Sequence, residues 1–478
     1  MKSQLYNLGD ILQACDGDSN VVEIDPVNLN QQSSTTKQLE SASQSLASYL
    51  YKEGYRPYDR IAILADNCLE LIICYLAILK LGGIVVMISS KATSSQITSM
   101  LQNSAVKLVF TDLSVITDLP VLNLVQIIEK SSDDIQFKSY RPNDNDTAII
   151  LHTSGSTGNP RRVEITHRAR IGMLANTRPR GTVKSLFANP LYHSMGMNSL
   201  DMNLYNKNDL FFLRKFDPSA YLKVIDRLRP TNLIGVPSMF SLLTLQHELI
   251  PTLDLSSALN IVLSGGATTP TLYNQLTHIF KNANIHIAYG STELGPGIFG
   301  PHKTLPKPPT SVGCEQEGIL YRIVDNVLQV KSPSMMKGYD GKNYNFTPDG
   351  YYITNDQFEV DQNGFYYFVG RSDDMFKSGG NKIFPSEIER VVEQHPSVDK
   401  CVALPIADSV KEFKPYAFIT LTPGSDTSAQ EIIMFLKDKL ARYQLPRQLW
   451  ILDEFPLSAV NKIDKQKLKV LAEQNLNI

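Results

Sequence analysis

The stretch IAILADNCLELIICYLAILKLGGIVVMI, residues 61–88, decides the fold class of this chain. Its first four residues form an apolar run typical of a buried strand, and residues 84–88 form a second one. Between them lies a helical stretch that leads to Gly82-Gly83. Charged side chains interrupt the stretch, so it cannot span a membrane and instead predicts a buried core. A strand, a helix and a further strand in this order predict a mostly parallel sheet covered by helices.

The same alternation of helices and strands extends on both sides of this stretch. Apolar residues at helical spacing over residues 39–50 precede it, and Val106 to Phe110 predicts a third strand after it. The middle of the chain contains similar short apolar runs, each ending near Gly, Ser or Pro: Ala148 to Leu151, Leu233 to Val236, Ile261 to Leu263 and Ile285 to Tyr289. Open α/β sheets bind ligands in the loops at their strand ends, so a site is expected there.

The C-terminal half of the chain has a different pattern. Residues 313–364 contain short strands with Asp-Asn, Asp-Gly and Asn-Gly turns, which predicts a β-rich subdomain. Beyond it a helix, a strand and a helix are expected over residues 387–394, 416–422 and 429–440. We therefore predict an α/β protein with a large N-terminal domain over residues 1–370, a hinge over residues 371–375 and a small α+β domain over residues 376–478. The hinge rests on Asp373-Asp374, a pair that is also common in ordinary surface turns.

Composition excludes several classes of protein. A length of 478 residues is enough for two or three domains of about 100 to 200 residues each. The formal charge of -2 gives no electrostatic reason to expect a nucleic acid partner. No signal peptide follows Met1, so a cytoplasmic location is expected. The five cysteines form no CxxC pair, which predicts reduced thiols instead of a zinc site or disulfides.

The strongest chemical signal is TSGSTGNPRR, residues 153–162, which directly follows a predicted strand. Glycines let backbone N–H groups approach phosphate oxygens, hydroxyls donate hydrogen bonds, and arginine neutralises charge with a planar fork. No Gly-Lys-Ser/Thr closes the loop, so it is not a Walker loop. Hydroxyls alone would be typical of a solvated turn, but the strand and the arginines favour a phosphate site. The candidate residues are Arg161, Thr153, Ser154, Gly155, Ser156, Thr157 and Gly158.

Further motifs follow this loop along the chain: Tyr289-Gly-Ser-Thr-Glu293, Thr354-Asn-Asp356, Gly370-Arg-Ser-Asp-Asp374 and Asn461-Lys462-Ile-Asp464. Together and in this order the motifs resemble the signature motifs of the adenylate-forming (AMP-binding) enzymes. That superfamily contains acyl-CoA and aryl-CoA ligases, adenylation domains of peptide synthetases and beetle luciferases. The resemblance runs from about residue 35 to the C-terminus. It implies that the chain uses ATP to activate a carboxylic acid as an acyl adenylate, releases pyrophosphate, and passes the acyl group to a thiol.

The resemblance implies roles at the base and phosphates of ATP. Glu293 would hold the Mg²⁺ that bridges the ATP phosphates, and Thr292 would hydrogen-bond the α-phosphate. Both roles suit the chemistry, because the attack of one anion on another needs neutralised charge and aligned groups. Tyr289 would stack on adenine, although a single tyrosine at a strand end is more often a core residue. The remaining candidates of this region are Gly265, Gly266, Ala267, Gly290 and Ser291.

Other matching positions concern the ribose and the small domain. Asp356 and Arg371 correspond to the residues that hold the ribose hydroxyls. By resemblance the small domain rotates about Asp373, and Lys462 would reach the substrate carboxylate and the phosphate in the first half-reaction. After rotation residues 377–382 would line a channel for the thiol of CoA or of a carrier protein's pantetheine. The candidates there are Gly379, Gly380 and Lys382.

Four residues depart from the usual pattern of the family. Arg161-Arg162 stands where most members have Lys-Gly, and arginine and lysine are not interchangeable at a tight phosphate site. Asn355 and Asn461 stand where glycine is usual. Asparagine tolerates a positive φ best after glycine, so both changes are expected to preserve a left-handed turn.

The segment PLYHSMG, residues 190–196, resembles the place where acyl-CoA and aryl-CoA ligases put an aromatic residue or a histidine beside the substrate carboxylate. His193 is the candidate. Relatives that activate amino acids carry an aspartate there, because a buried ammonium needs a counter-charge. The absence of this aspartate here favours a substrate acid without an α-amine. The walls of the acid pocket are expected to include residues 234–240 and 265–267.

Four functions are compatible with these residues. An AMP-forming acyl-CoA or aryl-CoA synthetase is favoured, and a ligase that loads the pantetheine of an acyl carrier protein comes next. A luciferase-like oxygenase would need O₂ and emit light. The departures at Arg161-Arg162 and Asn461 leave open a catalytically weak nucleotide-binding protein.

Overall fold

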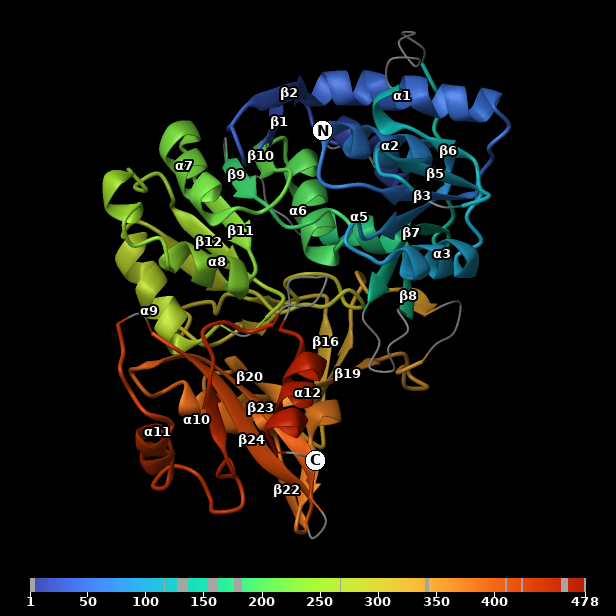
Figure 1. The fold of residues 1–478 in the computed structure, drawn as a ribbon. Helices are drawn as coiled ribbons and strands as arrows, with labels where there is room; N and C mark the ends of the chain where they lie inside the picture. The colour runs from blue at the N-terminus through green and yellow to red at the C-terminus, as the bar shows by residue number, and fades with distance from the viewer. Residues whose placement is uncertain are drawn as a thin grey trace.

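The computed structural model describes residues 5–115, 117–126, 136–153, 161–175, 183–266, 268–339, 344–408, 411–422, 424–456 and 463–476. It consists of a large N-terminal domain of helix-covered sheets and a smaller C-terminal domain (Figure 1). The predicted fold class is therefore confirmed. The domain boundaries at residues 370 and 376 stay a prediction.

The sheet predicted from residues 61–88 consists of β3 (Arg60–Leu64), β4 (Ile84–Ile88), β5 (Leu108–Thr111), β6 (Val121–Leu122), β7 (Thr147–Thr153), β8 (Arg161–Thr166) and β18 (Gly338–Tyr339). Its strands lie in the order β18-β8-β7-β4-β3-β5-β6. β4 runs parallel to β3 and β7, and β3 runs parallel to β5, whereas β8 is antiparallel to β7. The first two predicted strands are confirmed, and the third begins two residues later than expected, at Leu108.

Helix α2 (Leu69–Leu81) lies in the core of the large domain. Every residue of this helix except Glu70 is buried, as expected for a helix that is apolar on all sides. It packs against α1 (Thr36–Lys52) and η1 (Leu8–Gln13). The helix ends at Gly82, which has a φ of +81°. A Cβ on Gly82 would also lie 2.5 Å from the ring of Tyr140, so both backbone and space require glycine.

A second sheet positions most of the candidate residues. It consists of β1 (Asn20–Ile24), β2 (Gln31–Thr35), β9 (Lys184–Phe187), β10 (Asp209–Leu213), β11 (Asn232–Gly235), β12 (Asn260–Leu263) and β13 (Asn284–Ile287), in the order β13-β12-β11-β9-β10-β1-β2. β9, β11, β12 and β13 are parallel, so their carboxyl ends lie at one edge. The predicted strand over residues 285–289 already ends at Ile287, because Tyr289 leaves the sheet to contact Asp356.

Helices cover the faces of these sheets. Figure 1 shows α7 (Pro218–Leu228), α8 (Pro237–Thr244) and α9 (Pro270–Ile279) beside β11 and β12. The other elements of the large domain are α3 (Ser94–Asn103), α5 (His167–Ala175), α6 (Ser194–Tyr205) and η2 (Ile250–Thr252). In the ranges that the structure describes, no helix is both long and apolar enough to cross a membrane. The five cysteines are free thiols, as predicted.

The predicted β-rich subdomain is confirmed. It contains the pair β14 (Phe299–Gly300) and β15 (Cys314–Glu315), and a sheet of β16 (Leu320–Val324), β17 (Val327–Lys331), β19 (Tyr352–Val360) and β20 (Tyr366–Arg371). Asp325 and Asn326 have φ values of +50° and +63° in the turn between β16 and β17. Two positive φ values in succession are what a two-residue hairpin turn needs, and Asp and Asn tolerate them.

The small domain has its own apolar cores. Its elements are η3 (Ser372–Asp374), β21 (Phe376–Ser378), β22 (Asn381–Ile383), α10 (Pro385–Val392), β23 (Val398–Asp408), β24 (Glu412–Leu421), α11 (Ala429–Leu436), β25 (Leu449–Ile451) and α12 (Lys465–Leu476). The predicted helix over residues 387–394 begins earlier, because Pro385 can occupy the first turn. The predicted strand over residues 416–422 begins at Glu412, and the helix predicted to end at residue 440 ends at Leu436.

Candidate active site

Tyr289, Asp356 and Arg371 meet although they are far apart in the sequence. Tyr289 follows β13, Asp356 lies in β19, and Arg371 ends β20. The hydroxyl of Tyr289 donates to Oδ2 of Asp356 at 2.5 Å, and Nη1 of Arg371 lies 3.1 Å from Oδ1 of the same carboxylate. Nη2 of Arg371 lies 2.8 Å from Oδ2 of Asp373. The structure thus brings together the residues predicted for adenine, for ribose and for the hinge.

The backbone around Asn355 sets the position of Asp356. Asn355 has a φ of +60°, the left-handed conformation predicted for an asparagine in place of glycine. The N–H of Asp356 donates to Oγ1 of Thr354 at 3.0 Å. The hydroxyl of Ser372 donates to the carbonyl oxygen of Asn355 at 3.0 Å. These bonds hold Asp356 opposite Arg371, its partner in the ladder between β19 and β20.

The carboxyl group of Asp356 is buried and polarised. Asp356 is 7% exposed, and burial raises its pKa to about 6, although Arg371 and the hydrogen bond from Tyr289 act in the opposite direction. Burial and the neighbouring Asp356 raise the pKa of Tyr289, so the tyrosine stays protonated and is the donor. Each carboxylate oxygen has two lone pairs and can accept a further hydrogen bond. Such a carboxylate suits the hydroxyls of a ribose.

The turn that follows Tyr289 is tightly packed. A Cβ on Gly290 would collide with the carbonyl oxygen of Gly295, so only glycine fits. Ser291 and Gly295 form an isolated antiparallel bridge that closes the turn. Thr292 lies inside this turn and is half-buried. The local sequence therefore fixes the backbone of the residue predicted to contact the α-phosphate.

Glu293 and Arg161 contact the same tyrosine. Oε1 of Glu293 accepts a hydrogen bond from the hydroxyl of Tyr339 at 2.6 Å, and the guanidinium carbon of Arg161 lies 5.6 Å from the ring centroid of Tyr339. Arg161 pairs with Thr153 across β7 and β8. The arginine at the usual lysine position thus stands near the candidate magnesium ligand. The predictions for Ser154, Gly155, Ser156, Thr157 and Gly158 lie outside the described residues.

Glu293 is the carboxylate predicted to bind a metal ion at this site. Among the described residues no group of three or more His, Cys, Asp or Glu side chains could hold a metal by itself. Mg²⁺ is commonly bound by one or two carboxylates together with substrate phosphates and water. Glu293 therefore fits a Mg²⁺ that binds together with ATP.

Gly265 and Gly266 follow β12 at the same sheet edge as Tyr289. Gly265 has a φ of +81°, and its Cβ position would lie 3.4 Å from the side chain of Val236. The Cβ position of Gly266 would lie 3.5 Å from Pro237. The glycine segment therefore adjoins residues 234–240, as expected for two walls of one acid pocket. Ala267 lies outside the described residues.

His193 precedes α6 in the loop that follows β9, a strand parallel to β11. This loop therefore begins at the same sheet edge as the glycine segment. The ring of His193 packs edge-on against Tyr192, with 4.6 Å between centroids. Gly196 lies in the first turn of α6, where a Cβ would collide with the carbonyl oxygen of Pro190. The loop and the helix start are thus in close backbone contact.

Gly196→Ala is expected to lower the free energy of unfolding by about 1–3 kcal/mol, because the added methyl group forces the backbone beside His193 to move. Thermal unfolding and kcat/KM for the acid should both fall. Gly172→Ala in α5 is the matched control. Its Cβ would lie 3.6 Å from Pro333, an ordinary contact, so that variant should be as stable as the native protein. Equal behaviour of the two variants would contradict the packing argument.

The residues predicted for the thiol channel lie apart from the nucleotide residues. Gly379 and Gly380 form the turn between β21 and β22, with φ values of +57° and +84°. The N–H of Gly379 donates to the carbonyl oxygen of Lys411 at 3.1 Å. Lys382 pairs with Lys377 across this hairpin. Figure 1 shows β22 at the end of the small domain that is farthest from the large domain.

The start of α12 is held at the predicted hinge. Nζ of Lys465 lies 2.8 Å from Oδ2 of Asp374, next to the predicted pivot Asp373. Lys462 and Asn461 lie outside the described residues. Their predicted roles therefore stay predictions.

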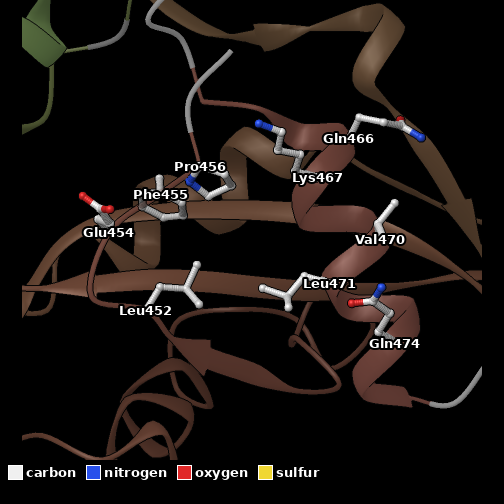
Figure 2. A pocket seen from close by; sticks show the side chains of 9 residues that line it. All are labelled: Leu452, Glu454, Phe455, Pro456, Gln466, Lys467, Val470, Leu471 and Gln474. Carbon is white, nitrogen blue, oxygen red and sulfur yellow. The ribbon is translucent and has the colours of Figure 1, made fainter.

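A groove on the small domain lies between α12 and the segment after β25. Leu452, Phe455, Val470 and Leu471 supply its apolar lining. Figure 2 shows Leu452 and Leu471 on opposite sides of it, and polar side chains such as Glu454 and Lys467 around it. The groove contains none of the candidate residues, so it takes no part in the chemistry argued below.

Tyr339 and Tyr352 were not predicted from the sequence. The hydroxyl groups of Tyr339 and Tyr352 lie 3.0 Å apart, and Tyr339 reaches Glu293, which precedes it by 46 residues. A contact over that separation leaves no periodic or spacing signal. The structure alone identifies both tyrosines as part of the site.

Comparison with protein families now gives the class of this chain. The model of the AMP-binding enzyme family matches residues 17–340, and the model of the AMP-binding enzyme C-terminal domain matches residues 387–462. The chain therefore belongs to the AMP-binding enzyme family. The resemblance inferred from the motifs is confirmed.

Individual relatives span nearly the whole chain. A long-chain-fatty-acid–CoA ligase of Bacillus subtilis (strain 168) is 27% identical, over 91% of this chain and 89% of its own. A 2-succinylbenzoate–CoA ligase of Geobacillus sp. (strain WCH70) is 25% identical, over 93% of this chain and 94% of its own. Among solved structures, ATP-bound MatB from Rhodopseudomonas palustris superposes with a TM-score of 0.87 at 21% identity, over 98% and 99% of the two chains. This last likeness shows that the fold is shared.

Proposed function

We propose that this enzyme activates a carboxylic acid with ATP to an acyl adenylate, releases pyrophosphate, and then forms a thioester with CoA. The observation that carries the proposal is the meeting of Tyr289, Asp356 and Arg371 beside the turn that holds Glu293. The names of the relatives support CoA as the acceptor, since both are CoA ligases and match over more than nine-tenths of the chain.

In the first half-reaction an oxygen of the substrate carboxylate attacks the α-phosphorus of ATP, and the bond from that phosphorus to pyrophosphate breaks. Asp356 accepts hydrogen bonds from the ribose, and Arg371 keeps that carboxylate in place. Arg161 offsets negative charge on the phosphates, while Thr292 donates a hydrogen bond to the α-phosphate. Glu293 would hold a Mg²⁺ that neutralises charge on the phosphates.

In the second half-reaction the CoA thiol attacks the carbonyl carbon of the acyl adenylate, and AMP leaves. The small domain rotates about Asp373 between the two steps, which removes Lys462 from the site and brings in the hairpin of Gly379 and Gly380. The present position of this hairpin, away from the large domain, suits the first step (Figure 1).

A panel of carboxylic acids tests the proposal through isotope exchange between pyrophosphate and ATP. At least one acid should support exchange without CoA, and that acid should give AMP and a thioester once CoA is added. A thioester formed only on an acyl carrier protein would replace CoA as the acceptor. Binding of ATP without exchange for any acid would contradict the proposal and favour a nucleotide-binding protein without ligase activity.

A further inference from the structure

The hydroxyl group of Tyr339 lies between a tyrosine and the candidate magnesium ligand. It is 2.6 Å from Oε1 of Glu293 and 3.0 Å from the hydroxyl oxygen of Tyr352. Tyr339 is 4% exposed and Tyr352 is 5% exposed, so water does not readily replace these bonds. Both tyrosines therefore take part in one buried series of hydrogen bonds that ends at Glu293.

The hydrogen bonds from Tyr352 through Tyr339 to Glu293 have a fixed direction. A carboxylate can only accept, so the single proton of the Tyr339 hydroxyl points to Glu293. A tyrosine hydroxyl carries its proton at neutral pH, so it can donate this hydrogen bond. Tyr352 must then donate to the oxygen of Tyr339. Two hydroxyl dipoles thus point the same way, toward Oε1 of Glu293.

Tyr339 is also held firmly by its surroundings. It pairs with Val163 of β8 through the two-residue strand β18. The N–H of Met336, just before this strand, donates to the carbonyl oxygen of Glu293 at 2.7 Å. The guanidinium group of Arg161 lies over the Tyr339 ring, an arrangement that is attractive between a cation and an aromatic face. The ring therefore connects β8, the strand that begins with Arg161, to Glu293.

We infer that Tyr339 is a positioning residue for the metal-binding carboxylate, with Tyr352 supporting it from the strand that also carries Asp356. The inference rests on the proposed function, in which Glu293 binds Mg²⁺ with ATP. Hydrogen-bond partners of metal ligands typically change metal affinity by about 10- to 100-fold when removed. Tyr339 therefore sets the affinity for Mg²⁺ through its hydrogen bond to Glu293.

Tyr339→Phe tests the inference, because it removes the hydroxyl and keeps the ring. The readout is the affinity for Mn²⁺ in the presence of α,β-methylene ATP, followed by the electron paramagnetic resonance signal of free Mn²⁺. The dissociation constant should rise about tenfold or more. In pyrophosphate exchange the half-saturating Mg²⁺ concentration should rise similarly, while kcat at saturating Mg²⁺ should recover.

Tyr366→Phe is the matched control. Tyr366 is 6% exposed, and its hydroxyl donates to Oε1 of Glu315 at 2.5 Å, so the change removes a similar Tyr–Glu bond that does not involve Glu293. Its Mn²⁺ affinity should match that of the native protein. Unchanged Mn²⁺ affinity in Tyr339→Phe, or an equal loss in both variants, would overturn the inference.

Two further variants keep the test decisive. Tyr352→Phe should weaken Mn²⁺ binding by about two- to fivefold, which is less than the effect of Tyr339→Phe. If Tyr339→Phe does not fold, Tyr352→Phe serves as the test variant. In Glu293→Gln, adding Tyr339→Phe should cause no further loss of Mn²⁺ affinity, since the carboxylate is already gone. Tight Mn²⁺ binding without exchange for any acid would refute the proposed function and leave this inference standing.

Discussion

Replacing Lys462 with alanine is expected to slow adenylate formation by about 10²- to 10³-fold and to leave thioester formation from supplied acyl adenylate within about twofold. The ammonium group of Lys462 would contact the substrate carboxylate and the phosphate only in the first half-reaction. It precedes by three residues Lys465, which is bound to Asp374 at the predicted hinge. If the small domain rotates as proposed, Lys462 should move with it between the two half-reactions.

The two steps can be measured separately. Pyrophosphate exchange reports on adenylate formation, and a single-turnover assay with synthetic acyl adenylate and CoA reports on the thioester step. Lys467→Ala, a change in α12 five residues further along the chain, is the control, since its side chain is 65% exposed and pairs only loosely with Asp464, at 3.8 Å. It should change neither step. An equal loss of both steps in Lys462→Ala would count against a rotating domain.

Gly380 gives the reciprocal test. Its φ is +84°, and a Cβ there would meet no atom within 4 Å, so Gly380→Ala strains the hairpin without a collision. The hairpin would enter the site only after rotation. The variant should therefore slow the thioester step and spare pyrophosphate exchange.

Local sequence patterns predicted those features that local physics determines. The strands at residues 61–64 and 84–88 are buried runs on either side of an apolar helix that ends at Gly82, and their bounds agree with the structure to within one residue. The left-handed turn at Asn355 was predicted because few residues tolerate it. In both cases the backbone preference of a few neighbouring residues agrees with the tertiary fold.

Contacts between distant segments could not be predicted in the same way. Motif order indicated that Tyr289, Asp356 and Arg371 share a site, but no pattern showed that the tyrosine hydroxyl and the guanidinium group would both bind the Asp356 carboxylate. Tyr339 was missed because its role arises only when β18 pairs with β8. The position of Arg161 over the Tyr339 ring likewise has no counterpart in the sequence.

Asp356→Asn is expected to weaken ATP binding by about 10- to 100-fold while making the protein more stable at neutral pH. Hydrogen bonds to a charged group contribute about 1.5–3 kcal/mol each, and asparagine loses one acceptor oxygen. Stability should change in the opposite direction, because burial makes the ionised carboxyl group costly in the folded state. A rise in pKa from 3.8 to about 6 corresponds to about 3 kcal/mol, an upper bound on the gain.

The pH dependence gives the sign of this effect. Between about pH 4 and pH 6 folded Asp356 keeps a proton that the unfolded chain has released, so the contribution of this group to native stability falls as pH rises through that window. The Tm of Asp356→Asn should therefore exceed that of the native protein above about pH 6 and match it near pH 4. ATP affinity of the native protein should fall below about pH 6, as the carboxylate becomes protonated.

Asp349→Asn is a control of opposite sign. Asp349 is paired with Arg322 at 2.7 Å, and the hydrogen bond from that arginine lowers its pKa to about 2. The ionised form is thus favoured in the folded state, and Asp349→Asn should lower Tm at neutral pH without changing ATP affinity. If Asp356→Asn instead lost stability at neutral pH, the ion pair with Arg371 would outweigh the cost of burial. Asp356 would then be a structural carboxylate, and the case for a ribose site built on it would fail.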